Sequence, residues 1–275
     1  MFAWLRRLRP VPAIPDRLWQ ATLDRYAFLG DLPADDRGRL RRLSAEFLRD
    51  KRFHGVGGFV ISDAVALAIA AQAVLPVLDL PDGLGWYDDF VGIVVHPSEV
   101  VAHRSIVDEA GVLHEYDEVV AGEAMERGPV MLSWQDVAAG ARTIEAGYNV
   151  VIHEFAHKLD MRNGPADGCP PLPPGFGGKR TASEALASWR SMMQTAYARF
   201  REQTLIAERF GGEAPWLDAY GAQSIAEFFA VACEAYFVNR AAFAEAFPEL
   251  LEGFDGFFHP HRESRQPSRP PSTEP

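Results

Sequence analysis

The strongest constraint on this chain is the pattern H-E-x-x-H, which places His153, Glu154 and His157 within one short stretch. On a helix, positions i and i+4 lie on the same face, so the two imidazoles can bind one tetrahedral zinc ion. Glu154 lies beside that face and can take a proton from an attacking water. The apolar residues from Val150 to Leu159 favour a buried helix over a solvated surface helix. Buried imidazoles need partners, so the stretch predicts a metal site.

Composition narrows the class of protein. The chain has 275 residues, of which 48% are hydrophobic and 24% charged, as in ordinary soluble globular proteins. A net charge of -11 argues against a nucleic-acid-binding face. Cys169 and Cys233 are expected to be free thiols in a reducing compartment. The basic N-terminus lacks the features of a signal peptide, and the apolar run Ala64–Leu78 is too short to span a membrane. We therefore expect a cytoplasmic protein.

Periodicity and capping signals predict an α+β fold that is mostly helical, with a small mixed sheet packed on the H-E-x-x-H helix. Residues 1–258 are expected to form a single domain with a helical N-terminal part, and 259–275 a disordered tail. Pro129, near the start of the strand Gly128–Ser133, suggests that this strand lies at an edge. The expected helices are Ile14–Leu29, Pro33–Arg52, Asp63–Leu75 after a Ser62 cap, Asp136–Ala146, Asn149–Met161, Ser183–Phe210 with Ser183 as its cap, and Ser224–Asn239. The other expected strands are Phe90–Val95 and Val112–Val120.

Glycine-rich stretches and further histidines outside the H-E-x-x-H pattern give no second site. The glycine-rich stretches near Gly57 and Gly177 lack the spacing of a phosphate-binding loop. His96, His103 and His114 lie outside any ligand spacing and are expected to be ordinary polar histidines. The Pro/Gly-rich loop Gly164–Gly178 is either a functional loop or a plain connector.

A catalytic zinc usually has three protein ligands, and spacing leaves three acids as candidates for the third. Asp160 shares the helix face of the two histidines. Glu227 and Glu234 lie seven residues apart on one face of a later apolar helix, where an acid needs a partner. The long metzincin pattern is excluded, because Asp160 and Asn163 stand where it needs glycine and histidine. The usual gluzincin E-x-x-x-D motif is also absent, since Val231 follows Glu227 at the place of the aspartate.

Four segments in order resemble the MtfA (Mlc titration factor A) family of bacterial zinc metallopeptidases: NVVIHEFAHKLDMRNG, GPVMLSWQD, DAYG and AEFFAVACEAYF. The resemblance covers roughly residues 33–257. It implies a zincin-like fold distantly similar to the catalytic domain of anthrax lethal factor. It also implies a zinc ion held by His153, His157 and Glu227, with Glu154 as the base and Tyr220 as an active-site tyrosine. Glu234 would then orient a histidine, and Asp160 would support the ligands or pack the helix.

The same resemblance implies aminopeptidase-like cleavage of small peptides, and binding of the glucose repressor Mlc by enterobacterial members. No acidic residue can be assigned from the sequence to hold a free N-terminus. Two alternatives stay open: a regulator that sequesters a repressor without relevant catalysis, and a closed structural zinc site with Asp160 or Glu234 as fourth ligand. Direct binding of nucleic acid and a membrane span are not expected.

Overall fold

The computed structural model describes residues 10–11, 13–107, 113–173 and 175–260. The helices and helical turns are α2 (Asp16–Arg25), α3 (Ala27–Gly30), α4 (Ala34–Asp50), α5 (Asp63–Val74), η1 (Leu75–Val77), η2 (Gly83–Tyr87), α6 (Trp134–Ala139), α7 (Val150–Asp160), η3 (Phe176–Gly178), α8 (Ala182–Phe210), η4 (Ala219–Ala222), α9 (Ile225–Val238), α10 (Arg240–Ala246) and α11 (Pro248–Phe258). The strands are β1 (Arg52–Gly55), β2 (Gly92–His96), β3 (Val100–Val107), β4 (Leu113–Val120), β5 (Gly122–Ala124) and β6 (Val130–Ser133).

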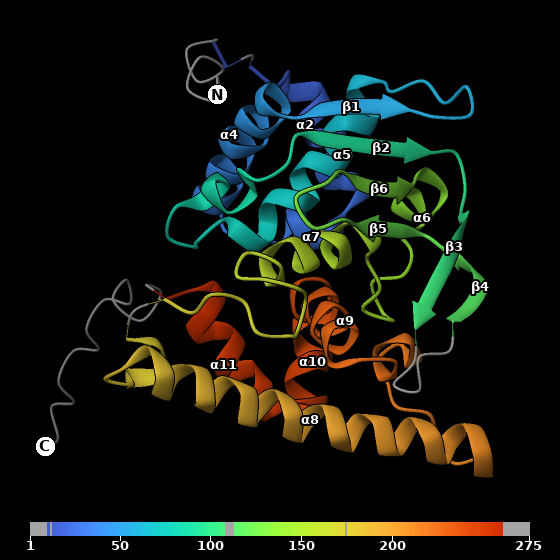
Figure 1. The fold of residues 1–275 in the computed structure, drawn as a ribbon. Coiled ribbons are helices and arrows are strands. Elements are labelled where there is room, and N and C mark those ends of the chain that lie inside the picture. The colour runs from blue at the N-terminus through green and yellow to red at the C-terminus, as the bar shows by residue number, and fades with distance from the viewer. Residues whose placement is uncertain (1–9, 12, 108–112, 174, 261–275) are drawn as a thin grey trace, which may run out of the picture.

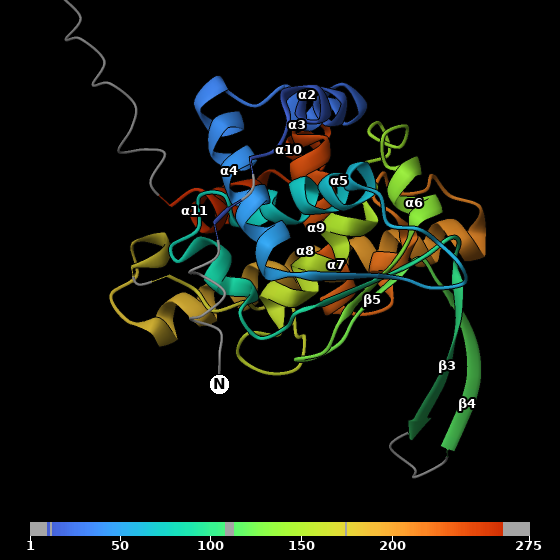
Figure 2. The same cartoon turned by 90° about the horizontal axis from the view of Figure 1, so that it is seen from above.

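Four strands form a small mixed sheet in the order β1-β2-β6-β5. The three longer strands run parallel, and β5 pairs antiparallel to β6 at the end of the sheet. β3 and β4 form a separate antiparallel ribbon, which projects from the body of the molecule next to β5 (Figures 1 and 2). The expected α+β class, mostly helical with a small mixed sheet, is therefore confirmed.

Two helices form the centre of the molecule because they are apolar on every side. α5 begins at the expected Ser62 cap, whose hydroxyl accepts a hydrogen bond from the Val65 amide. Most of its residues are buried between α4, α2 and α7. α9 is buried over almost its whole length and packs on α7, α8 and α10. Figure 1 shows the resulting layers, from the sheet through α7 and α9 to the long helix α8. Among the described residues, no helix has both the length and the apolar character that a bilayer span needs.

The strand Gly128–Ser133 was expected at an edge, and this prediction is wrong. β6 starts at Val130 and lies between β2 and β5, so it is an inner strand. Pro129 precedes the first paired residue and takes no donor out of the ladder, which is why a proline is tolerated there. The edge strand next to β6 is β5, which is three residues long and includes Gly122. Such a short strand gives no periodic signal.

Several helix boundaries also differ from the expectation, and the helix expected over Ile14–Leu29 is divided into α2 and α3 by the non-helical backbone of Tyr26. Thr181, and not Ser183, caps α8, since its hydroxyl accepts from the Glu184 amide and the Glu184 carboxylate accepts from the Thr181 amide. That reciprocal pair is a capping box. The helix expected from Asp136 to Ala146 ends at Ala139, and turns follow up to Gly147, whose φ of +71° ends any helical path. The expected tail lies, from residue 261 on, outside the described residues.

Candidate metal centre

Helix α7 presents the H-E-x-x-H residues from within the core. Asn149 caps it, with its side-chain oxygen accepting from the Ile152 amide at 3.0 Å. Every residue from Val150 to Asp160 is buried. His153 and His157 keep only 9% of their surface exposed, and Glu154 keeps 4%. The expectation of a buried helix, rather than a solvated one, is confirmed.

Helix α9 brings Glu227 to the two histidines. Ser224 caps α9 through a hydrogen bond from the Glu227 amide to its hydroxyl, at 3.1 Å. This places Glu227 in the first turn, where the positive end of the helix dipole favours a carboxylate. Seventy residues separate Glu227 from His157 in sequence, and α9 closes that gap by packing directly on α7.

Three ligand-type atoms converge here. His153 Nε2 lies 3.1 Å and His157 Nε2 3.2 Å from Glu227 Oε2, and the two Nε2 atoms lie 3.2 Å apart. A tetrahedral zinc bound at about 2.0–2.2 Å would separate its ligand atoms by about 3.3–3.5 Å, close to this triangle. The described residues thus bring together a His-His-Glu group able to hold a metal ion. Neither Asp160 nor Glu234 belongs to it.

Glu234 binds the far side of the His153 ring. Its Oε1 lies 2.7 Å from His153 Nδ1, and its Oε2 accepts a hydrogen bond from the Asn149 amide. The Asn149 side chain donates in turn to Gln72 Oε1 at 2.7 Å. Because a carboxylate only accepts, Glu234 holds a proton on Nδ1, so that Nε2 is the nitrogen of His153 that faces the cluster. This chain of contacts fixes the orientation of the His153 ring, and the orienting role of Glu234 toward a metal ligand stays a prediction.

The carboxylates and imidazoles of the centre shift one another's pKa. Burial raises the pKa of Glu154 to about 7, and the neighbouring imidazoles oppose that rise. Burial also favours the neutral form of Glu227, but hydrogen bonds with His153 and His157 outweigh it and hold its pKa well below the usual range. For His153 burial lowers the pKa, and the hydrogen bonds that its ring donates to Glu227 and Glu234 raise it well above normal. The site is therefore electrostatically matched to a cation.

Gly122 on the edge strand lies directly against the Glu154 carboxyl group. A Cβ at this position would lie 2.5 Å from Glu154 Oε1 and 2.7 Å from its Cγ. No real side-chain contact is so short, so the position accommodates glycine alone unless Glu154 moves. β5 and the side chain of Glu154 are thus packed together at one end of the sheet.

A pocket of about 250 Å³ opens beside this group. His153, Glu154, Gly122, Tyr148 and Tyr220 are among the residues that line it. The Tyr220 ring lies 5.9 Å from that of His153, centroid to centroid. The turn η4 holds Tyr220 there, because Asp218 Oδ1 accepts from the Tyr220 amide at 2.9 Å.

Asp160, weighed above as a ligand or a packing residue, binds the following loop. Its two oxygens accept from the amides of Gly168, at 2.7 Å, and Cys169, at 2.8 Å. Gly168 has a φ of +74°, and a Cβ there would lie 2.9 Å from the Ile225 carbonyl oxygen at the start of α9. The loop at Gly168 and Cys169 therefore contacts both the end of α7 and the start of α9, the helix that carries Glu227.

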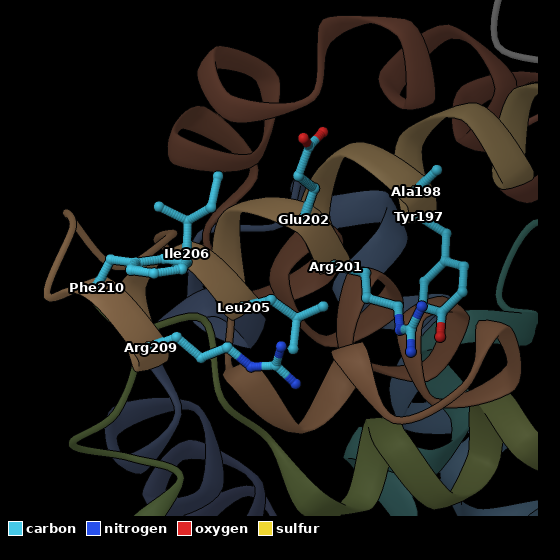
Figure 3. Close-up of a pocket in the computed structure, with 8 residues that line it drawn as sticks. All are labelled: Tyr197, Ala198, Arg201, Glu202, Leu205, Ile206, Arg209 and Phe210. Atoms are coloured by element: carbon cyan, nitrogen blue, oxygen red, sulfur yellow. The ribbon is translucent and has the colours of Figure 1, made fainter.

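The other sites considered from the sequence stay apart from this centre. His96 ends β2 and does not belong to the His-His-Glu group, and the side chains of His103 and His114 lie outside the described residues. Cys169 and Cys233 are buried free thiols, as expected. A second hollow of about 350 Å³ lies on the C-terminal half of α8, and Figure 3 shows its side chains, which include Arg201, Leu205 and Phe210. It contains no residue of the candidate centre.

Sequence reasoning missed several residues that support the centre. Lys158 is fully buried and donates to the carbonyl groups of Met125, at 2.6 Å, and Gly128, at 3.0 Å, so it fixes the turn between β5 and β6. Gln72 had one signal, as the polar break in an apolar run. Gly122 had none, because its role comes from a contact with a residue 32 positions away in sequence, and its neighbour Glu154 was recognised for another reason.

Comparison with known proteins gives a consistent picture. The family model described as glucose-regulated metallo-peptidase M90 matches residues 2–259. A protein named Mlc titration factor A from Edwardsiella ictaluri is 35% identical over 262 residues, covering 94% of this chain and 93% of the relative. Proteins of the same name from Cronobacter sakazakii and Escherichia fergusonii are 32% and 31% identical, each over 94% of this chain and 91% of the relative.

Proposed function

The chain belongs to the glucose-regulated metallo-peptidase family M90, and on that premise we propose that it is a zinc-dependent, aminopeptidase-like enzyme that hydrolyses peptide bonds. The observation that carries the proposal is the convergence of His153, His157 and Glu227 beside the buried carboxyl group of Glu154. We assign the first three as metal ligands and Glu154 as general base. Residues 1–258 are proposed to act as one domain, in the cytoplasm.

A zinc ion in this site would supply Lewis acidity, lowering the pKa of a water and polarising the scissile carbonyl group. Glu154 takes the proton of the attacking water and passes it to the leaving amine. Its burial supports this role, since a base with a pKa near 7 works well at neutral pH. Tyr220 donates a hydrogen bond to the developing oxyanion, and η4 fixes its backbone for that purpose.

We propose that the substrate backbone pairs with the free edge of β5. β5 ends the four-stranded sheet, and Gly122 brings its backbone next to the base. Strand addition of this kind fixes a peptide through main-chain hydrogen bonds. It would place the scissile bond within reach of Glu154.

The donor set argues against the structural-zinc alternative. A closed structural site has four protein ligands. Here Glu234 is bonded to His153 and Asn149, and Asp160 is bonded to the loop amides, so both candidates for a fourth ligand are engaged elsewhere. The remaining position is open to the pocket beside His153.

The names of the relatives support a second proposal, binding of an Mlc-like repressor of sugar uptake. The two roles are separable in cells that contain such a repressor. If Glu154→Gln keeps the regulatory effect, repressor binding does not need catalysis. If the effect disappears while the protein still binds the repressor, the regulation works through hydrolysis.

The experiment that tests the peptidase is a peptide-library digestion by wild-type protein as purified, after chelation, and after return of zinc. We expect cleavage that is lost on chelation and restored by zinc. Cleavage that persists unchanged in the chelated protein, or no cleavage of any peptide by a protein containing zinc, would contradict the proposal.

A further inference from the structure

The pocket beside the candidate metal centre is acidic. Four carboxyl groups line it, from Glu99, Glu154, Asp218 and Glu234, and none of its described lining residues is lysine or arginine. Such a lining creates a negative potential in a confined space, where field lines are focused. Glu234 is already bonded to His153 and Asn149, so three acids remain to act on a ligand.

Glu154 points to a ligand independently of the other two. It is 4% exposed, lines the pocket, and has no hydrogen-bond partner among the residues that the structure describes. An occupant of the pocket that brings a donor or a positive charge would give this largely buried carboxyl group a partner.

Glu99 and Asp218 reach the pocket from two different elements. Glu99 lies between β2 and the foot of β3, next to the register pair Val100–Val120 and hence to the edge strand. Asp218 caps η4 through one oxygen, which fixes the carboxylate and leaves the second oxygen for a ligand. Both side chains are exposed at the mouth, where a substrate would enter.

We propose that this pocket binds a cationic nitrogen of the substrate next to the scissile bond, with Asp218 and Glu99 as its anchors. This inference rests on the proposed peptidase function and assigns a specificity to the same site. A volume of about 250 Å³ is below the range of about 300–1,000 Å³ that whole small-molecule ligands occupy, so it fits one residue. A protonated N-terminal amine and a lysine or arginine side chain share the required chemistry.

The same charges exclude a peptide that enters by its C-terminus. A terminal carboxylate would meet Asp218 and Glu99, and no lysine or arginine among the described lining residues offsets the repulsion between these like charges. The pocket therefore orients the chain, so that the positively charged end of the substrate lies within it.

Binding of defined dipeptides tests the inference without relying on turnover. The probes are Ala-Leu-amide, N-acetyl-Ala-Leu-amide and N-acetyl-Lys-Leu-amide, measured by calorimetry on zinc-loaded Glu154→Gln protein at low salt. We expect the free amine or the lysyl peptide to bind about tenfold more tightly than the neutral acetylated peptide. Whichever of the two cationic probes binds identifies the source of the nitrogen.

Substitution of the anchors in the same background should reduce that preference. Asp218→Asn keeps an oxygen for the Tyr220 amide and removes only the charge. Glu99→Gln removes the charge of the second anchor and keeps the size of its side chain. Each should weaken the cationic probe about two- to fivefold, the range of an exposed ion pair, and the double variant should remove the preference. Glu208→Gln on α8, an exposed acid away from the pocket, is the matched control and should change nothing.

Equal binding of all three probes, or an unchanged preference in the double variant, would overturn the inference. The proposed function is scored separately, by hydrolysis of the same dipeptides with wild-type protein. Hydrolysis without a preference for a cation leaves the peptidase standing and removes the anchors. A preference for the cationic probes in binding, without any hydrolysis, supports the anchors and contradicts the proposed peptidase.

Discussion

Exchange of Glu234 for glutamine tests whether the tautomer of His153 is set by its carboxylate partner. In the native site both Glu234 oxygens accept, one facing His153 Nδ1 at 2.7 Å and the other the Asn149 amide. The Asn149 N–H is a backbone donor and requires an oxygen. A glutamine must therefore turn its NH₂ group toward His153, which forces Nδ1 to accept and moves the ring proton to Nε2.

A proton on Nε2 removes the lone pair that faces Glu227 and His157. We expect Glu234→Gln to lower zinc affinity by roughly 10- to 100-fold, the usual effect of losing such a partner, or about 1.4–2.7 kcal/mol. The upper part of that range fits this site, because Glu234 is only 2% exposed and water cannot replace the lost contact. The assay is competition for zinc against a chromophoric chelator at fixed pH.

Asp160→Asn is the matched control for this change. Asp160 is also fully buried and also accepts two backbone N–H groups, but it contacts no member of the His-His-Glu group through a hydrogen bond. Its amide should destabilise the fold by about 1–3 kcal/mol, measured by denaturant unfolding, and leave zinc affinity within about twofold. The reasoning is refuted if Glu234→Gln binds zinc as tightly as wild type, or if both variants lose affinity equally.

Three further changes probe the base, the tyrosine and the fold. Gly122→Ala should push its Cβ into the Glu154 carboxyl group and lower kcat roughly tenfold to 100-fold while zinc binding persists. The control is Gly38→Ala, whose added Cβ would meet no atom within 4 Å. Normal turnover by Gly122→Ala would count against the proposed packing. Tyr220→Phe should lower kcat by roughly 100-fold, an oxyanion-donor effect, with zinc content unchanged in metal analysis; an unaltered kcat removes that role. Burial lowers the pKa of Lys51 to about 8 from its ordinary 10.5, so the native state binds fewer protons than the unfolded chain between those values, and the free energy of unfolding should rise with pH across that window. In Lys51→Met that rise should be missing from urea titrations at pH 8 and pH 10, and an identical rise in both proteins would show that another group causes it.

The candidate site residues of the H-E-x-x-H helix were predictable because they lie within five consecutive positions of the sequence. His153, Glu154 and His157 share one helix, and the apolar residues around them indicate burial. Glu227 could not be chosen in this way, since spacing left Asp160, Glu227 and Glu234 as equally good candidates for the third ligand. Only the resemblance to a known family separated them, because the packing of α9 on α7 brings together residues 70 positions apart.

The edge strand shows where local reasoning ends. A proline near the start of β6 was interpreted as an edge signal, but the proline lies outside the ladder and β6 is an inner strand. The edge strand beside it, β5, has three residues, and it is held in place by pairing with β6 and by Lys158, which binds the turn between them. These are contacts between segments that are distant in sequence, and hydrophobic periodicity does not predict them.

The helices that were best predicted are those whose entire environment is apolar. α5 and α9 lie where their composition indicates, with the expected Ser62 and Ser224 at their starts. Boundaries were less secure where two capping residues compete. Thr181 caps α8 in place of Ser183. Of these two residues, only Thr181 has a glutamate three positions later, Glu184, which completes the capping box.

Zinc content and peptide hydrolysis, measured together on wild type and Glu154→Gln, test the central claim most directly. If His153, His157 and Glu227 hold the metal and Glu154 is the base, both proteins should contain about one zinc ion per chain. Wild type alone should then hydrolyse peptides, with the variant slower by at least about 100-fold. A Glu154→Gln protein that retains wild-type turnover, or a wild-type protein that hydrolyses peptides without bound metal, would contradict the account.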